Sequence, residues 1–112
     1  MAEQREFQRR PERLPVRYRV APDDAPTPAE TRDISGGGLG LVLKEPFAPG
    51  VKLLIELDLR DRGPWARVTG QVAWSEPAVR TQAPLAWRPM AVGVKFVRID
   101  ASDPRLHRRL FP

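Results

Sequence analysis

The sequence predicts an all-β fold: a six-stranded antiparallel barrel with a flexible N-terminal arm and a short C-terminal helix. Six segments have the length and the alternating apolar and polar residues of strands, and turns rich in proline and glycine separate them. No internal segment has helical periodicity, which favours a barrel. The 112 residues suffice for one domain. We expect the arm to span residues 1–13 and the barrel with its helical turn to span residues 14–112.

The N-terminal arm is basic and has almost no residues that could join a core. Residues 5–13 contain four arginines and a single aromatic residue. Pro11 disfavours helical backbone at Arg10 and removes one backbone donor. We therefore expect an extended segment whose arginines are available to a ligand.

The first three strands are expected in the first half of the chain. At Pro15–Val20, apolar residues alternate with arginines, as in a strand with one buried face. Three prolines and two aspartates in residues 21–28 predict a loop, so the second strand, Glu30–Ile34, is expected to be stunted. Leu39–Leu43 is an extended apolar run, and Pro46–Gly50 ends it with two prolines and a glycine.

The last three strands are expected in the second half. Val51–Leu59 alternates along its length, apart from one extra leucine. Residues 61–64 predict a hairpin turn, because they contain aspartate, glycine and proline, and Trp65–Trp74 is the next strand. The proline-containing residues 76–89 are expected to form a loop before the last strand, Met90–Ile99.

A short helix is expected near the C-terminus. Asp103 followed by Pro104 is typical of a helix start, with the aspartate as the cap and the proline in the first position. Arg105, Arg108 and Arg109 should then lie on the solvated face, where cations suit the negative end of a helix.

The charge of the chain favours an anionic ligand or partner. The formal net charge is +5, and sixteen of the nineteen cations are arginines. Arginine presents a planar fork of donors that meets phosphates and guanine edges in pairs. No segment approaches the roughly 18 consecutive apolar residues of a membrane span, and the N-terminus lacks the apolar run of a secretory signal. With no cysteine for disulfides, a cytoplasmic location is expected.

Catalysis is poorly provided for. The single histidine, His107, lies among arginines near the end of the chain, where a solvated surface position is the simpler interpretation. A nucleophile built on it would need a positioned serine and an orienting acid. The spacing motifs of zinc and calcium sites are absent from the sequence. We expect no enzyme and no metal.

A glycine-rich turn is the best candidate for a binding site. Gly36–Gly38 lies between two expected strands, so it is not a phosphate loop, which needs a helix behind it. Taken alone, it is a hairpin turn whose glycines allow positive φ. Asp33 and Ser35 beside it change that interpretation, because a carboxylate accepts from the donors of a guanine edge and bare glycine N–H groups approach phosphates. The set fits a ligand that carries guanines and phosphates.

Two motifs resemble those of the PilZ domain family. Arg9–Arg13 resembles the family's RxxxR motif, and Asp33–Gly38 matches its DxSxxG motif in full. Gly70–Trp74 and Gly93–Phe96 are also similar to segments of the family. The resemblance covers nearly the whole chain.

The resemblance implies a receptor for the second messenger cyclic di-GMP, with no further cofactor. Its arginine arm would clamp the phosphates and guanine faces of the ligand, and wrapping of the arm would change the conformation of the protein. It also implies regulation of a protein partner in a motility, envelope or regulatory pathway. The ligand-binding residues that it implies are Arg9, Arg10, Arg13, Asp33, Ser35, Gly37 and Gly38.

Two other functions stay open at this point. The chain could be a PilZ-type interaction module that does not bind cyclic di-GMP. Less favoured is a small basic barrel that binds nucleic acid, because it would need exposed aromatic residues along one strand face. Trp65 and Trp74 are expected in the barrel core or at its rim. Trp87, in the expected loop, is either an exposed contact for a partner or packed on the barrel.

Overall fold

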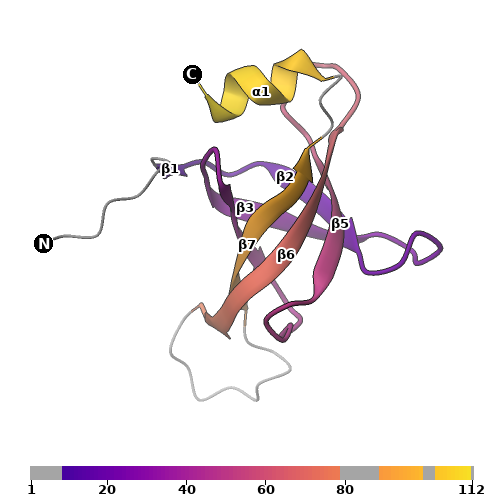
Figure 1. Cartoon of the computed structure of the whole chain (residues 1–112), viewed down its shortest axis with the longest axis vertical. Coiled ribbons are helices and arrows are strands. Elements are labelled where there is room, and N and C mark those ends of the chain that lie inside the picture. Colours follow the sequence, from indigo (N-terminus) through magenta and orange to yellow (C-terminus); the bar gives the residue numbers. More distant parts are fainter. Residues whose placement is uncertain (1–8, 79–88, 100–102, 112) are drawn as a thin grey trace, which may run out of the picture.

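The computed structural model describes residues 9–78, 89–99 and 103–111. It confirms the predicted antiparallel barrel of six strands with a short C-terminal helix, and it adds a short strand in the arm (Figure 1). The elements are β1 (Arg10–Pro11), β2 (Pro15–Arg19), β3 (Thr27–Ile34), β4 (Gly38–Leu43), β5 (Lys52–Leu57), β6 (Ala66–Pro77), β7 (Met90–Ile99) and α1 (Pro104–Leu110).

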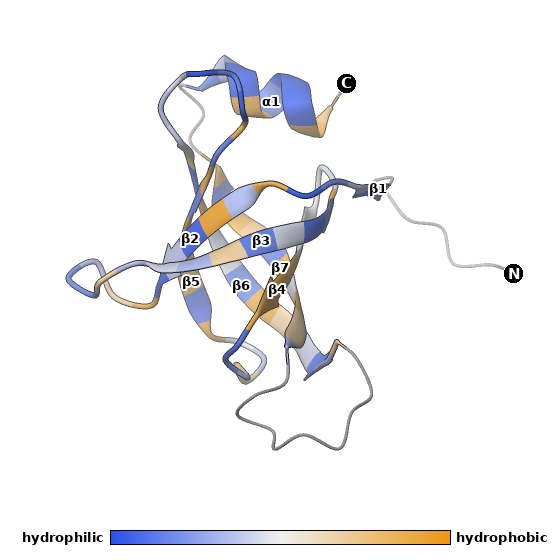
Figure 2. Ribbon diagram, turned by 180° about the vertical axis from the view of Figure 1, so that it is seen from behind, coloured by the Kyte–Doolittle hydropathy of each residue, from blue (hydrophilic) through white to orange (hydrophobic). Residues whose placement is uncertain are grey.

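The strands form one antiparallel sheet that closes on itself. Its order is β1-β3-β2-β5-β6-β7-β4, and pairing of β3 with β4 completes the ring (Figure 2). β1 lies outside the ring and pairs with the end of β3, with Pro11 opposite Asp33. Closure leaves none of the six barrel strands with a long unpaired edge, which protects a small β protein from edge-to-edge association.

The core follows from the alternation of the strands. On β5, Leu53, Ile55 and Leu57 are buried, while the residues between them are at least partly exposed, because successive side chains of a strand point to opposite faces. Residues from the six barrel strands meet inside the ring in a single cluster, which also includes Leu106 and Leu110 of α1. One face of the helix therefore packs onto the core, while Pro104, His107 and Arg108 on its other side are exposed.

Two strands are longer than the sequence predicts. β3 begins at Thr27 and has eight residues, so the prediction of a stunted second strand was wrong. Pro28 fits there because β4 pairs with β3 only from Glu30 onward, which leaves no β4 partner for the N–H that proline lacks. β6 begins one residue after Trp65 and continues to Pro77, beyond its predicted end, because it pairs with β7 as far as Met90.

The helix is fixed to the barrel by arginines that were expected to be solvated. Asp103 caps α1 by accepting from the N–H of Arg105, and Pro104 stands in the first turn, as predicted. The Arg105 guanidinium donates to both carboxylate oxygens of Asp61 at 2.9 Å and to the carbonyl oxygen of Pro64 at 2.7 Å. The prediction of a solvated side chain was wrong for Arg105, because these acceptors come from the β5–β6 connection, which is distant in the sequence.

Candidate functional site

The turn between β3 and β4 is organised by the hydroxyl of Ser35. The N–H groups of Gly37 and Gly38 both donate to Ser35 Oγ, at 3.2 Å each, and the N–H of Ser35 donates to the carbonyl of Gly38 at 3.0 Å. Ser35 is buried. Its oxygen therefore shapes the turn from within and holds two glycine N–H groups in place.

Gly38 is needed for a close approach rather than for an unusual backbone angle. A Cβ atom at this position would lie 2.1 Å from the carbonyl oxygen of Val94. The N–H of Phe96 donates to the carbonyl of Gly37 at 2.9 Å, so β7 holds the turn from the side. Among the described glycines only Gly50 has positive φ, so the glycines of this turn do not serve to allow a left-handed backbone.

Asp33 reaches the outer wall of the barrel through a β-bulge. The register of β3 against β4 shifts between Thr31 and Asp33. As a result Thr31 points inward and is fully buried, while Arg32 and Asp33 both retain exposure. The Asp33 carboxylate lies over Gly40, where a Cβ atom would come within 2.7 Å of its Oδ1. Arg32 forms an ion pair with Asp33 at 3.5 Å.

Two glycines opposite each other let the larger side chains of Asp33 and Trp74 pack closely on the wall. Gly40 on β4 pairs in register with Gly93 on β7, and Gly93 pairs with Trp74 on β6. The indole of Trp74 covers Gly93, where a Cβ atom would lie 2.2 Å from its Nε1. The guanidinium of Arg32 lies 5.6 Å from the centre of the Trp74 ring. Asp33, the two glycines and the indole therefore form a continuous strip on the outer wall.

Most of this strip was not predicted from the sequence. Trp74 was expected in the barrel core or at its rim, whereas its ring is only partly buried and lies on the outer wall. The available signal was the presence of glycine inside two strands, because a glycine there often marks a close approach by another group. Trp65 is likewise partly buried outside the core, with Arg17 at 4.1 Å from its ring centre. Trp87 lies outside the described residues.

The arginine arm runs directly past the glycine turn. Arg10 and Pro11 pair with Ile34 and Asp33, so the backbone of the arm is adjacent to the predicted acidic contact. Thr31 anchors the arm from beneath: its hydroxyl donates to the carbonyl of Glu12 at 2.5 Å and accepts from the N–H of Leu14 at 2.8 Å. The structure thus brings the two motifs together, although they are 24 residues apart from Arg9 to Asp33.

The three predicted arginines differ in their contacts. Arg9 and Arg13 are exposed, and neither forms an ion pair or hydrogen bond within the described part of the chain. Arg10 is partly buried and donates to the carbonyl oxygen of Arg109, in the last turn of α1. The Arg109 side chain in turn contacts Glu12 and the carbonyl of Leu59. The expectation that Arg109 is solvated was therefore wrong: it joins the arm, the helix and the barrel.

Within residues 9–78, 89–99 and 103–111, histidines, aspartates and glutamates form no group that could hold a metal ion. No helix in the described ranges is long and apolar enough to cross a membrane.

Comparisons with known proteins identify the family and the fold. A family model described as PilZ domain matches residues 3–111. No curated protein matches the chain. Its fold is similar to that of the Bacillus subtilis inhibitor of motility (MotI/DgrA), with a TM-score of 0.69 and 18% identity. This match covers 97% of the chain and 53% of that protein, so the chain spans about half of its length.

Two structures from Escherichia coli are also similar. One is the PilZ domain of YcgR with c-di-GMP, with a TM-score of 0.62 and 16% identity, covering 96% of the chain and 86% of that domain. The other is YcgR in complex with c-di-GMP, with a TM-score of 0.66 and 17% identity, covering 96% and 43%. At these identities the likeness establishes the fold.

Proposed function

The chain belongs to the PilZ domain family, and on that premise we propose that it is a non-catalytic receptor for cyclic di-GMP that changes conformation on binding and regulates a protein partner. The observation that carries the proposal is the pairing of β1 with the end of β3, which puts the arginine arm beside the Asp33–Gly38 turn. Cations for phosphates and an acid for a guanine edge then face the same ligand.

Each predicted residue has a place in this proposal. The exposed guanidinium groups of Arg9 and Arg13 are free to meet phosphates and the O6/N7 edge of guanine. Asp33 accepts from the Watson–Crick donors of guanine after exchanging its ion pair with Arg32. Ser35 and the glycines Gly37 and Gly38 hold the turn against which the ligand lies.

The glycine strip suits a flat ligand ring. The Asp33 carboxylate lies over Gly40 and the indole of Trp74 lies over Gly93, so the two groups are neighbours on the wall. A guanine that meets this strip would contact the carboxylate and the partly exposed indole. Stacking of a base on an aromatic ring contributes about 1–3 kcal/mol, which is comparable to one good arginine contact.

The conformational change is proposed to act through Arg10. Arg10 donates to the carbonyl oxygen of Arg109 in the last turn of α1, and Glu12, two residues further along the arm, contacts the side chain of Arg109. If the ligand recruits Arg10, the arm must give up the contact with the helix. Binding would then alter how α1 is held, and this change would be visible to a partner.

A partner in a motility, envelope or regulatory pathway is part of the same proposal. Support comes from the fold of the inhibitor of motility, to which the chain is similar. A cytoplasmic location accompanies it, supported by a sequence of 112 residues without cysteine.

Calorimetric titration with cyclic di-GMP tests the receptor function, with GTP and linear pGpG as controls. We expect selective binding, and we expect Arg9→Ala and Arg13→Ala each to cost about 1–3 kcal/mol, roughly ten- to hundredfold in affinity. Circular dichroism should find both variants folded, because the two side chains are exposed. The double variant should lose binding.

Two results would contradict the proposal. Absence of heat with the folded protein would leave a PilZ-fold module that acts without the messenger. Equal affinity for GTP and cyclic di-GMP would indicate a general anion site rather than a receptor for a cyclic dinucleotide.

A further inference from the structure

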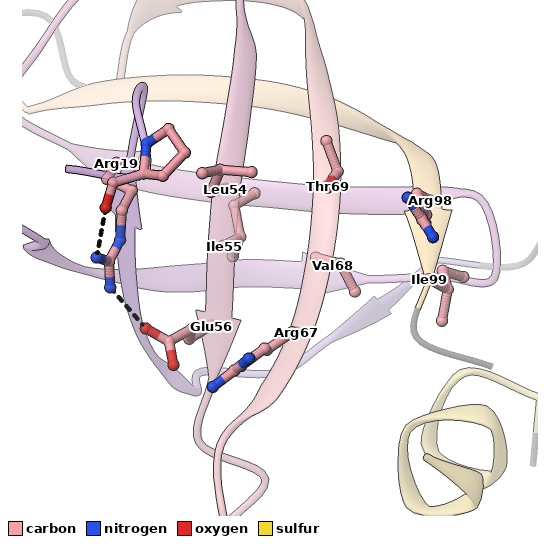
Figure 3. A pocket seen from close by; sticks show the side chains of 10 residues that line it. Arg19, Leu54, Ile55, Glu56, Arg67, Val68, Thr69, Arg98 and Ile99 are labelled. Atoms are coloured by element: carbon pink, nitrogen blue, oxygen red, sulfur yellow. Dashed lines mark hydrogen bonds and ion pairs between the residues drawn. The ribbon is translucent and has the colours of Figure 1, made fainter. Parts of the chain in front are cut away.

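A concave surface lies on the wall of the barrel opposite the candidate ligand site. In the ring of strands, the β5–β6 seam is three steps away from the β3–β4 seam that carries the candidate ligand site. Over β5 and β6 the wall has a hollow of about 740 Å³ (Figure 3). Six side chains that point outward from the strands line it, and this surface is called the basic hollow below: Arg19, Leu54, Glu56, Arg67, Thr69 and Arg98.

The basic hollow is built by cross-strand neighbours. Arg19 pairs with Leu54, Leu54 with Thr69, and Thr69 with Arg98, so one row of outward side chains crosses four strands. Arg67 belongs to the next outward row, opposite Glu56. Pro22, in the connection between β2 and β3, also lines the hollow.

The charge of the hollow is unbalanced. Glu56 is its single acid, and it already contacts two arginines, Arg17 at 3.3 Å and Arg19 at 3.1 Å. Arg67 and Arg98 are exposed, and neither forms an ion pair or hydrogen bond in the part of the chain that the structure describes. Two guanidinium groups are therefore left to pair with acids from outside.

The floor of the hollow is apolar. Leu54 faces outward and is therefore only partly buried. Ile99, which is also partly buried, lines the hollow as well. None of the lining residues is aromatic, so bases would have nothing on which to stack. The absence of a stacking surface among these residues disfavours nucleic acid, and the apolar floor beside exposed arginines favours a polypeptide with acidic and apolar side chains.

We propose that the basic hollow docks an acidic, partly apolar segment of a protein partner. This inference rests on the proposed adaptor role but not on the binding of cyclic di-GMP. Arg67 and Arg98 are two residues apart along the strands and one strand apart across them, so their Cα atoms lie about 8 Å from each other. An extended segment with two acids two positions apart has a spacing of about 7 Å, which matches.

The same geometry places the apolar contact. Leu54 lies on β5 and Arg98 on β7, and Thr69 of β6 lies between them in the same row. Arg67, Arg98 and Leu54 form a triangle with sides of about 8–10 Å. A segment that bends towards β5 after its second acid would therefore place an apolar residue, two positions later, over Leu54. The partner segment is therefore expected to carry acid, acid and apolar residue at alternate positions.

The test uses a short labelled peptide with two glutamates two positions apart and a leucine two positions further on. Its binding to the full chain is measured by fluorescence anisotropy at about 50 and 200 mM salt, because surface ion pairs weaken as salt rises. A peptide with glutamines in place of both glutamates, and a single-stranded oligonucleotide, serve as probes of specificity. We expect the acidic peptide to bind best, with a Kd below about 1 mM.

Variants then locate the site. Arg67→Ala and Arg98→Ala should each weaken peptide binding about two- to fivefold, the usual worth of an exposed ion pair. Arg108→Ala removes the same charge from an exposed position on α1 and should leave binding unchanged. Glu56→Gln should strengthen binding, because it removes the single acid and frees two arginines.

Three outcomes would overturn the inference: no binding of the acidic peptide, equal effects of Arg108→Ala and Arg67→Ala, or tighter binding of the oligonucleotide. Titration of the same variants with cyclic di-GMP separates this inference from the receptor function. Arg67→Ala and Arg98→Ala should leave the affinity for cyclic di-GMP unchanged. If the unmodified chain does not bind cyclic di-GMP at all, the peptide result still stands.

Discussion

The hydroxyl of Ser35 and the missing side chain of Gly38 act on the same turn. Ser35 Oγ accepts two glycine N–H groups, and Gly38 lets β4 pass close to the backbone of β7. Both residues belong to the motif that the resemblance assigns to ligand binding. Their contacts indicate that they contribute indirectly, because they shape the surface on which Asp33 and the arm meet.

Gly38→Ala should therefore damage both stability and binding. The added Cβ would lie 2.1 Å from a backbone oxygen of Val94, which cannot move without disturbing β7. Forcing an extra methyl group into a tight site costs about 1–3 kcal/mol. Urea unfolding measures this loss, and titration with cyclic di-GMP measures the loss of binding.

Gly50→Ala is the matched control for that variant. Gly50 has φ of 96° and nothing within 4 Å of an added Cβ, so the cost is backbone strain alone, about 1–2 kcal/mol. Its turn is remote from the ligand motifs, so affinity for the messenger should not change. Normal stability and affinity in Gly38→Ala would show that close approach is not the role of this glycine.

At the scale of elements, the C-terminal helix is held by ionic contacts as well as by its buried leucines. Arg105 lies between Asp61 of the β5–β6 connection and Asp103, the helix cap. A hydrogen bond from the Gly63 N–H, followed by those from Arg105, holds the pKa of Asp61 below its ordinary value. The Arg105 side chain is the main cause of the lowered pKa of Asp103.

These lowered pKa values predict a loss of stability in acid. A carboxylate whose pKa is depressed by folding contributes stability fully above its unfolded value, and the contribution is lost as the pH falls through the folded value. For Asp61 and Asp103 the loss should begin as the pH drops below about 4. Unfolding midpoints in urea, measured from about pH 6 to pH 3, follow it.

Arg105→Leu identifies the cause of that acid sensitivity. Without the guanidinium, the pKa of Asp103 loses the main cause of its depression and that of Asp61 loses a secondary one, so stability should depend less steeply on pH in this range. Arg105→Lys keeps a positive charge but not the planar guanidinium. The pH dependence of its stability should lie between those of the unmodified protein and Arg105→Leu. The same slope in all three proteins would exclude a role for this contact in acid unfolding.

At the scale of the whole molecule, the barrel has a sealed interior and two outer walls with different chemistry. One wall carries the arm, the glycine strip and the turn, and the other carries the basic hollow. The alternation within β5 separates interior from exterior at adjacent positions. Leu53 is fully buried, whereas Leu54 forms the floor of the hollow.

These two leucines allow a direct comparison. Leu53→Ala should cost about 2–5 kcal/mol, since it leaves a cavity in the closed core, a large share of the roughly 5–15 kcal/mol that stabilises a domain. Leu54→Ala should cost much less, because its side chain is only partly buried. Thermal or urea unfolding measures both, and equal losses would mean that the hollow is closed in solution.

The sequence by itself determined the barrel, because the period of two in each strand and the turns between strands are local properties. It also determined the cap of α1, since Asp103 and Pro104 act within one turn. The candidate ligand residues were identified from local motifs in the same way.

Only the tertiary structure decided which residues face each other across strands. The pairing of Gly40 with Gly93, the indole over that pair and the acceptors of Arg105 and Arg109 all join positions distant in the chain. No local pattern encodes such contacts, because strand register and barrel closure set them. For the same reason the basic hollow, whose arginines come from three strands, is invisible until the sheet is closed.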